Sequence, residues 1–233
     1  MTSNNIRIIT IQFSENISEA EIPYFRGCVN QALGKEADLL FHNHKDDKEY
    51  RYSYPLIQYK RIRQKAAIVC INEGVDVIGQ FFLCEKTNYQ IGTHNMNMFI
   101  ENMTQDITPV CICQVENKYR IHRWQALNSK NYNIYIGTDS LTEKTTILEN
   151  ILKANILSFA KGLNITIDEQ ISVKLTYISK PYTTINKGIK FMTFNAEFTS
   201  NISLPDHIGL GKNASIGYGN IKKLYKPRYT QQQ

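Results

Sequence analysis

Two of the five histidines, His42 and His44, are separated by a single residue, and a basic, tyrosine-rich stretch begins at Tyr50. If this segment is extended, both imidazoles project from the same face of the chain. Such a pair can cleave RNA: one neutral imidazole takes the proton from a ribose 2′-hydroxyl, which attacks the adjacent phosphorus, and a cationic imidazole protonates the departing 5′ oxygen. A nearby lysine or arginine would stabilise the charge that develops on the phosphate oxygens.

The histidine pair has two other interpretations. His-x-His can supply two ligands to a metal ion, but no well-spaced Asp, Glu or Cys partner follows, and Asp46 and Asp47 are typical of a turn. The pair is also compatible with two polar side chains in a surface loop. Taken alone, its spacing favours this last and simplest interpretation.

A second candidate is the glycine-rich segment 208–219, IGLGKNASIGYG, in which two Gly-x-Gly pairs flank five residues. Glycine tolerates positive φ and close backbone approach, so successive N–H groups can point at a phosphate, which Lys212 would help to neutralise. The segment is not a Walker loop, because Asp206 stands where a glycine is needed, and not a Rossmann fingerprint, because it leads into a strand. The alternative is a hairpin connection with bulges.

A third candidate is the stretch 50–63, in which aromatic and basic residues are interleaved. Aromatic rings on a strand can stack on bases while neighbouring cations contact phosphates. The stretch lacks an RNP consensus, and an amphipathic strand with its aromatic side chains in the core would show the same pattern.

The placement of charge is more informative than its total, which is +6 from 27 Lys and Arg against 21 Asp and Glu. Residues 51–65 hold five basic residues and no acidic one, and residues 201–233 hold five basic residues against Asp206 alone. Two basic patches suit a polyanion as partner. Two solvated strands and a basic tail would explain the charge equally well.

Length and composition exclude several classes. A chain of 233 residues, 42% of them apolar, can bury a sizeable core, which argues against disorder. No apolar run approaches the roughly 18 residues of a membrane span, and the first residues do not have the pattern of a signal peptide. The five cysteines are odd in number and lie in apolar stretches, which indicates reduced thiols and a cytosolic location.

Hydrophobic periodicity predicts the elements that hold these candidates. Helical spacing runs from Ile22 toward Gly34, and a longer helix follows Ser140, which forms a capping box with Glu143. The predicted strands are 5–13, 66–71, 110–115, 118–125, 133–136, 172–178, 190–198 and 219–224, and a hairpin-like pair of extended segments flanks the turn 45–49. This order predicts an α+β fold of two tandem ferredoxin-like (RRM-like) β-α-β-β-α-β units, with domains at 1–108 and 109–233.

Taken together, these features resemble one family. The glycine-rich segment, with a hydrophobic residue inside each Gly-x-Gly pair and Lys212 between the pairs, resembles the C-terminal glycine loop of RAMP-superfamily proteins. Residues 41–62, FHNHKDDKEYRYSYPLIQYKRI, resemble the N-terminal half of the CRISPR-associated repeat-RNA endoribonucleases, the "Cas-six" family, and the clustered histidines resemble its b-type branch. Tandem ferredoxin-like units are the architecture of that family, so the resemblance spans nearly the whole chain.

The resemblance implies an enzyme that cuts precursor CRISPR RNA once within each repeat. It implies cleavage with no metal and no other cofactor, leaving a 5′-hydroxyl and a 2′,3′-cyclic phosphate or 3′-phosphate. Carried over to this sequence, it makes His44 the first candidate for general base or acid, with His42 as its partner. The catalytic candidates are His42, His44, Tyr54 and Lys60, with Lys45 and Tyr52 as alternatives. The RNA-binding candidates are Arg51, Tyr52, Arg61, Arg63, Gly209, Gly211, Lys212, Ser215, Gly217 and Gly219.

The partner that the resemblance implies is CRISPR repeat RNA, as substrate and product, in the cytoplasm of a prokaryote and away from membranes. It leaves open a homodimer and contacts with other CRISPR-associated effector subunits. An alternative of a different class is a non-catalytic RAMP subunit that holds mature CRISPR RNA, which would need the glycine loop but not the histidine pair. An unrelated RRM-like RNA-binding protein would leave the glycine spacing to chance.

Overall fold

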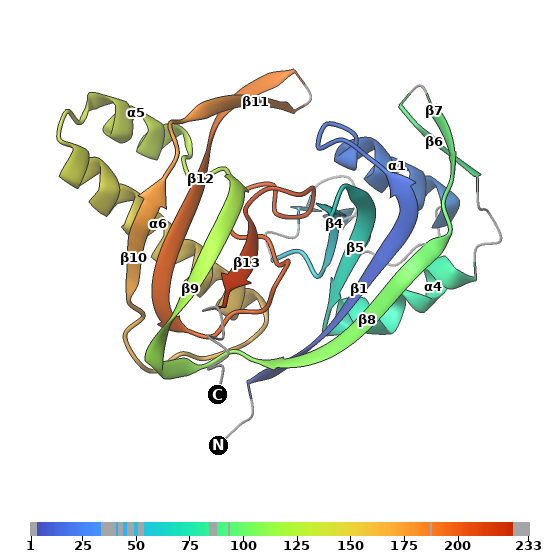
Figure 1. Ribbon diagram of the computed structural model, residues 1–233, viewed down its shortest axis with the longest axis horizontal. Helices are drawn as coiled ribbons and strands as arrows, with labels where there is room; N and C mark the ends of the chain where they lie inside the picture. The colour runs from blue at the N-terminus through green and yellow to red at the C-terminus, as the bar shows by residue number, and fades with distance from the viewer. Residues whose placement is uncertain are drawn as a thin grey trace, which may run out of the picture.

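The computed structural model describes residues 4–33, 41, 44–45, 49–50, 54–83, 88–92, 94–186 and 188–225. The two larger antiparallel sheets lie side by side, one from each half of the chain (Figure 1), and the N-terminal half also contains two small two-stranded sheets. The N-terminal half forms β1 (Asn5–Asn16), α1 (Ile22–Leu33), β2 (His44–Lys45), β3 (Glu49–Tyr50), β4 (Ile57–Ile62), β5 (Lys65–Ile71), α3 (Glu73–Val77), α4 (Gly79–Phe82), β6 (Asn88–Ile91), β7 (His94–Asn97) and β8 (Ile100–Pro109). The C-terminal half forms β9 (Ile112–Trp124), α5 (Ser129–Gly137), α6 (Leu141–Gly162), β10 (Val173–Ile178), β11 (Tyr182–Asn186), β12 (Ile189–Ile202) and β13 (Asn220–Leu224).

The N-terminal sheet has the strand order β4-β5-β1-β8, and each neighbouring pair is antiparallel. With α1 after β1 and the short helices α3 and α4 after β5, these elements follow the β-α-β-β-α-β order of a ferredoxin-like unit. The turn from β4 to β5 has positive φ at Arg63 (49°) and Gln64 (70°), which is typical of a tight hairpin turn that follows the twist of its strands.

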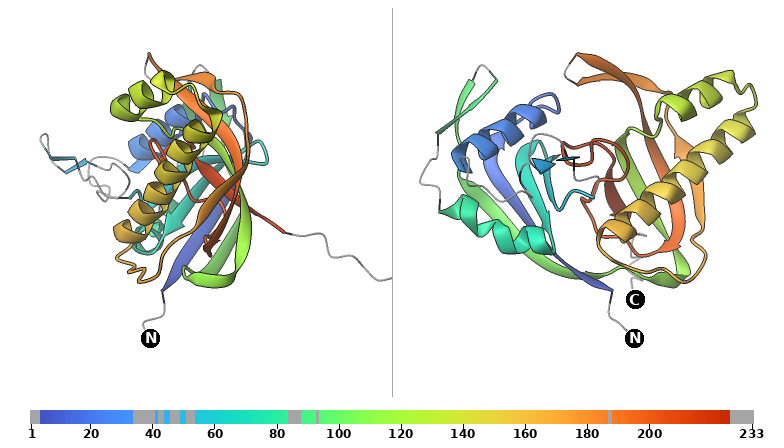
Figure 2. Two further views of the ribbon diagram at one scale, coloured as in Figure 1. Left: turned by 90° about the vertical axis from the view of Figure 1, so that its left-hand side faces the viewer. Right: turned by 180° about the vertical axis from the view of Figure 1, so that it is seen from behind.

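The C-terminal sheet has the order β10-β12-β9-β13, and β11 pairs with the first part of β12. Helices α5 and α6 lie on one face of this sheet (Figure 2). The side chain of Ser140 caps α6, as predicted, by accepting a hydrogen bond from the Glu143 amide at 3.3 Å. Between β12 and β13, residues 203–219 form turns and the glycine-rich segment instead of a second helix. Apart from this missing second helix, the predicted α+β fold of tandem ferredoxin-like units is confirmed.

Strand β5 shows how the two halves pack together. Alternate residues of this strand belong to a core shared with the C-terminal half, and the residues between them pack with α1. The first set is Ala67, Val69 and Ile71, and the second is Ala66, Ile68 and Cys70. A strand covered on both faces has a continuous apolar sequence, which is why residues 66–71 could be predicted as a buried strand.

Three sequence predictions were wrong. Residues 133–136 lie in helix α5 and not in a strand. The Asn131 amide donates to the side-chain oxygen of Asn128 at 2.8 Å, and this N-cap favours a helix despite the strand-like pattern of the sequence. The predicted strands 110–115 and 118–125 form one strand, β9, because its pairing with β12 continues from Trp124 to Ile112. Cys111 is exposed, unlike the buried Cys28 and Cys70.

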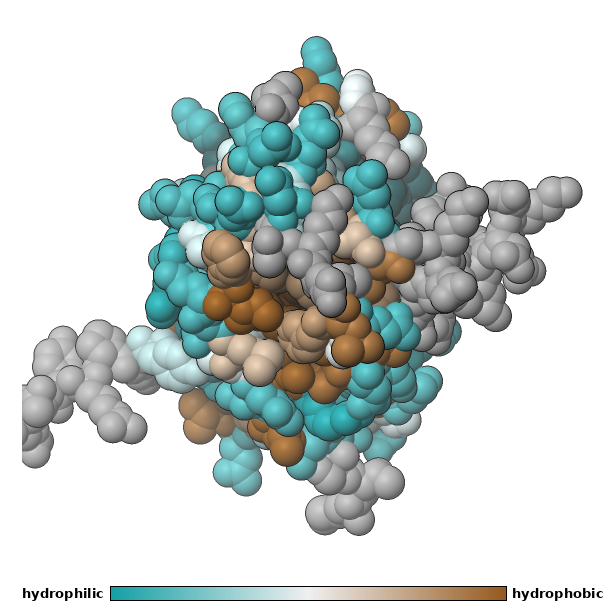
Figure 3. All heavy atoms as spheres, turned by 90° about the vertical axis from the view of Figure 1, so that its right-hand side faces the viewer, coloured by the Kyte–Doolittle hydropathy of each residue, from teal (hydrophilic) through white to brown (hydrophobic). Residues whose placement is uncertain are grey.

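Figure 3 shows apolar side chains on the outer side of the N-terminal half, where α4 and the start of β8 lie. The exposed large apolar residues of these two elements and their neighbours are Phe82, Leu83, Phe99, Ile100 and Met103. Among the described residues, no helix has both the length and the apolar composition that crossing a membrane requires.

Candidate functional site

The glycine-rich segment docks against the edge of the N-terminal sheet. The amide of Tyr59 in β4 donates to the Ser215 carbonyl at 2.8 Å, and Tyr59 forms an isolated parallel bridge with Ile216. The amide of Gly209 donates to Oε1 of the buried Gln58 side chain at 2.9 Å. Because β4 is an edge strand, the backbone groups on its outer side are free to pair with the glycine-rich segment, and this pairing links the two halves.

Close packing explains the glycines of this segment. A Cβ on Gly219, whose φ is +62°, would collide with the Leu210 carbonyl oxygen, and a Cβ on Gly217 would lie 2.6 Å from Cδ1 of Ile22. The amide of Gly219 donates to the Arg123 carbonyl at 3.0 Å. The amides of Gly209 and Gly219 therefore serve the protein's own hydrogen bonds. Of the predicted RNA-binding residues here, Gly209, Gly217 and Gly219 are buried, Gly211 and Ser215 are partly exposed, and Lys212 is exposed.

Tyr54 and Lys60, both catalytic candidates, lie beneath the glycine-rich segment. The Tyr54 hydroxyl donates to the Gly209 carbonyl at 2.8 Å, and its ring packs edge-on against Phe159 of α6. The Lys60 side chain is 0% exposed, and its Nζ donates to the Ala214 carbonyl at 3.3 Å. These contacts favour a structural role in holding the segment over direct contact with a substrate.

Burial also shifts the titration of both groups. Burial raises the pKa of the Tyr54 hydroxyl, and burial lowers the pKa of the Lys60 ammonium from 10.5 to about 7. Burying a charged ammonium away from water costs free energy, and a hydrogen bond to one carbonyl oxygen offsets only part of that cost. Lys60 can therefore lose its proton much closer to neutral pH than an exposed lysine does.

The exposed cations near the segment come from separate elements. Arg63 is exposed in the β4–β5 turn, Lys212 in the glycine-rich segment and Lys222 in β13. The pKa of His207 is lowered by burial and by the neighbouring Lys60, Lys222 and Arg63, against a raising effect of Asp206. Arg61, also an RNA-binding candidate, donates from Nε to the Ile17 carbonyl at 2.6 Å and is partly buried.

The histidine candidates are described only in part. His44 lies in β2, where it pairs with Tyr50 of β3, so two short strands meet at the predicted turn. Phe41, which was predicted to lie in the extended segment before the turn, is helical instead. His42, Arg51 and Tyr52 lie outside the described residues. Within the described ranges, no three His, Cys, Asp or Glu side chains are grouped closely enough to hold a metal ion.

Sequence reasoning missed an ionic cluster between the two halves. Glu19, which precedes α1, accepts from Nε2 of His122 at 2.6 Å, and its second oxygen lies 3.2 Å from Nε of Arg123. The hydrogen bond from His122 lowers the pKa of the Glu19 carboxyl, against a smaller raising effect of burial. The Arg123 guanidinium lies 4.3 Å from the ring centre of Tyr218. Since Glu19 and His122 are 103 residues apart, no local pattern could have joined them.

Comparisons with known proteins agree with this architecture. The Cas6b N-terminal domain matches residues 4–108, and the Cas6b C-terminal domain matches residues 111–224. An uncharacterized protein of Methanocaldococcus jannaschii, MJ0978, is 38% identical over 108 residues, which cover 46% of this chain and 72% of that protein.

Solved structures resemble the whole chain. A crystal structure of Cas6b superposes with a TM-score of 0.85 at 26% identity, covering 94% of this chain and 100% of that one. A crystal structure of the CRISPR RNA processing endoribonuclease Cas6b superposes with a TM-score of 0.71 at 25% identity, with the same coverage. Since the two matched domains together span nearly all of the described residues, the chain belongs to the Cas6b family.

Proposed function

We propose that this protein is an endoribonuclease that cuts precursor CRISPR RNA within its repeats. The observation that carries the proposal is the match of both Cas6b domains across residues 4–108 and 111–224. It is supported by the similarity to a structure of a CRISPR RNA processing endoribonuclease at a TM-score of 0.71. The substrate and product are CRISPR repeat RNA, and the protein acts in the cytoplasm of a prokaryote.

The reaction that we propose uses His42 and His44 and no metal ion. One neutral imidazole removes the proton from the 2′-hydroxyl, the oxygen attacks the adjacent phosphorus, and the other imidazole, as a cation, protonates the departing 5′ oxygen. An imidazole pKa near 6.5 allows both forms to coexist around neutral pH. The products are a 5′-hydroxyl and a 2′,3′-cyclic phosphate, which can open to a 3′-phosphate.

Other predicted residues take different roles in this proposal. Tyr54 and Lys60 donate to carbonyls of the glycine-rich segment, so they act as positioning residues for the surface that receives RNA. The exposed Arg63, Lys212 and Lys222 contact phosphates of the RNA. Arg51 and Tyr52 extend this contact on the histidine side, and a homodimer or other CRISPR-associated subunits can share it.

The experiment compares cleavage and binding in histidine variants. Purified protein is incubated with end-labelled repeat RNA from the host's own CRISPR array, and product ends are identified by mass. We expect one cut per repeat, which the His42→Ala, His44→Ala double variant abolishes while RNA binding stays within a few-fold of wild type. His94→Ala is the matched control, since His94 is exposed in β7. Tight binding of mature CRISPR RNA without any cleavage by the wild type would instead support the non-catalytic subunit.

A further inference from the structure

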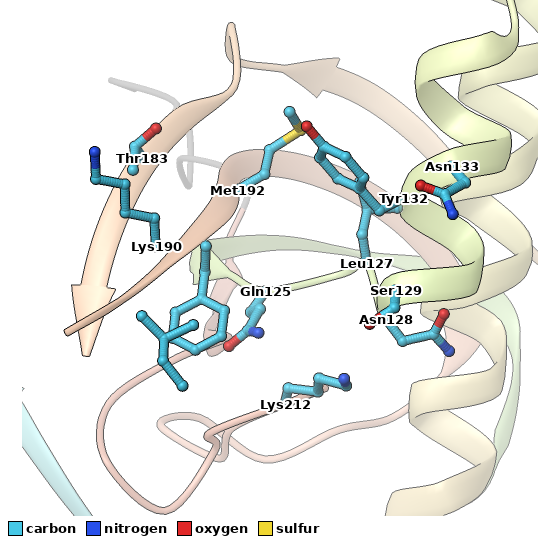
Figure 4. Close-up of a pocket in the computed structure, with 12 residues that line it drawn as sticks. Gln125, Leu127, Asn128, Ser129, Tyr132, Asn133, Thr183, Lys190, Met192 and Lys212 are labelled. Atoms are coloured by element: carbon cyan, nitrogen blue, oxygen red, sulfur yellow. The ribbon is translucent and has the colours of Figure 1, made fainter. Parts of the chain in front are cut away.

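A pocket of about 450 Å³ lies in the C-terminal half, between α5, the β11–β12 hairpin and the glycine-rich segment (Figure 4). Tyr132 enters it from α5, Lys190 from β12 and Lys212 from the glycine-rich segment. Such a volume lies within the range of sites that bind small ligands. Neither β2 nor β3 contributes a lining residue, and of the residues that line the pocket only Lys212 has been given a role in RNA binding above.

The lining of this pocket combines aromatic, cationic, neutral polar and aliphatic side chains. Tyr132 presents an aromatic ring that is 43% exposed, and Lys190 and Lys212 are exposed cations. Gln125, Asn128 and Asn133 contribute carboxamides, and Ser129 and Thr183 contribute hydroxyls. The apolar part of the lining comes from Leu127, Ile189, Phe191 and Met192, and none of the residues that line the pocket is acidic.

A hydrogen bond and close packing hold the floor of the pocket. Gln125 is 3% exposed, and its Oε1 accepts a hydrogen bond from Nδ2 of Asn213 at 2.7 Å. Because the oxygen is engaged, the Gln125 side chain offers its NH₂ group as donor. A Cβ on Gly211 would lie 3.0 Å from Oδ1 of Asn155 and 3.2 Å from Nε1 of Trp124, so the backbone that precedes Lys212 is closely packed.

We propose that this pocket binds one unpaired nucleotide of the repeat RNA, with its base stacked on Tyr132, its edge facing the carboxamides and its phosphate near Lys212. Stacking on an exposed aromatic ring together with cations along the backbone is how single-stranded nucleic acids are held. The NH₂ groups of Gln125 and Asn128 can donate to the edge of a base, and the Asn133 carboxamide can both donate and accept. The lack of carboxylates suits a polyanion. A double helix does not fit a hollow of this size, whereas a single splayed nucleotide does. The inference rests on the proposed function, because it takes the occupant to be the repeat RNA.

The test uses repeat RNAs in which 2-aminopurine, a fluorescent base, replaces one unpaired nucleotide at a time. We expect the fluorescence at one position to change when wild-type protein binds, and this change to be lost in Tyr132→Ala and kept in Tyr132→Phe. Tyr132→Ala should also weaken RNA binding by roughly 5- to 100-fold, the effect of one lost stack. Tyr177→Ala is the matched control, since Tyr177 is 57% exposed on β10 and does not line the pocket. Urea unfolding of each variant establishes that it is folded.

The outcomes separate this inference from the proposed function. If the wild type cleaves repeat RNA but Tyr132→Ala binds that RNA as tightly as the wild type does, the proposed nucleotide pocket is wrong and the proposed function stands. Wild-type protein that does not cleave, yet binds with the Tyr132 dependence described, would overturn the function and support the pocket. Saturable binding of adenosine monophosphate that requires Tyr132, with RNA binding unaffected by the variant, would overturn RNA as the occupant.

Discussion

Replacing Lys60 by methionine changes how the stability of the protein depends on pH. The Lys60 side chain is 0% exposed, with the Ala214 carbonyl 3.3 Å from its Nζ, and its pKa is lowered to about 7 by burial. In the unfolded chain the same group titrates near 10.5. Between these two pH values the unfolded state binds more protons than the folded state, so stability rises as the pH is raised from 7 toward 10.5. Below about pH 7 both states are protonated, and this contribution no longer changes.

The size of the effect follows from the difference in pKa. Each pKa unit corresponds to about 1.4 kcal/mol, so raising the pH from 7 to 9 should increase the free energy of unfolding by about 2 kcal/mol through Lys60 alone. With a urea dependence of about 2–3 kcal/mol per M, the unfolding midpoint moves upward by about 1 M. Methionine has a similar length and no titratable group, so Lys60→Met should lose this increase.

The assay is urea unfolding at pH 7 and pH 9, followed by circular dichroism, for wild type and variant. Lys174→Met is the control, because Lys174 is exposed on β10 and should leave the wild-type difference unchanged. A pH dependence in Lys60→Met equal to that of wild type would refute a buried lysine with a lowered pKa. If Lys60→Met is folded and binds RNA but no longer cleaves it, Lys60 takes part in catalysis and is not only a positioning residue.

The remaining predictions concern the glycine-rich segment and the contact between the halves. Gly219→Ala should lower the urea midpoint more than Gly188→Ala, because both have positive φ but only the Cβ of the former would collide with a neighbour; equal losses would contradict the packing explanation. Lys212→Ala should weaken RNA binding and reduce the slope of log affinity against log salt by about one, and an unchanged slope would exclude a phosphate contact. Glu19→Gln should destabilise the protein at pH 6 by less than about 1 kcal/mol, since the pair is partly exposed. Because the Glu19 pKa lies below 4.5, unfolding free energies of wild type and Glu19→Gln should converge as the pH falls through the folded pKa, and a constant difference would argue against the ion pair.

Local signals in the sequence predicted much of the fold. The Ser140 cap, the period-two pattern of residues 5–13 and the helical spacing from Ile22 each depend on residues a few positions apart, and each element was found. Helix α5 was missed because the apolar residues at 134 and 136 have strand-like spacing, whereas its cap at Asn128 lies outside that short window. None of its residues is fully buried, and it is held by that cap together with the partly buried Tyr135, whose ring packs edge-on against Phe194.

The candidate site was less predictable because its contacts are long-range. The cluster of glycines was visible in the sequence, but the partner of the Gly209 amide is Gln58, 151 residues away. Likewise, Lys60 belongs to a basic run that suggested contact with phosphate, and only the packing of the glycine-rich segment over β4 explains its burial. A basic run in the sequence therefore does not distinguish a residue such as Lys60, which packs between the two halves, from a residue that binds RNA.

The most direct test of the proposed function is cleavage of repeat RNA in excess EDTA, with and without a single 2′-deoxy substitution at the nucleotide before the cut. If His42 and His44 activate the 2′-hydroxyl, the unmodified RNA is cut at the same rate in EDTA and in Mg²⁺. The deoxy RNA is then bound but left intact, because the attacking oxygen is missing. Cleavage that requires Mg²⁺, or that persists on the deoxy RNA, would contradict the mechanism.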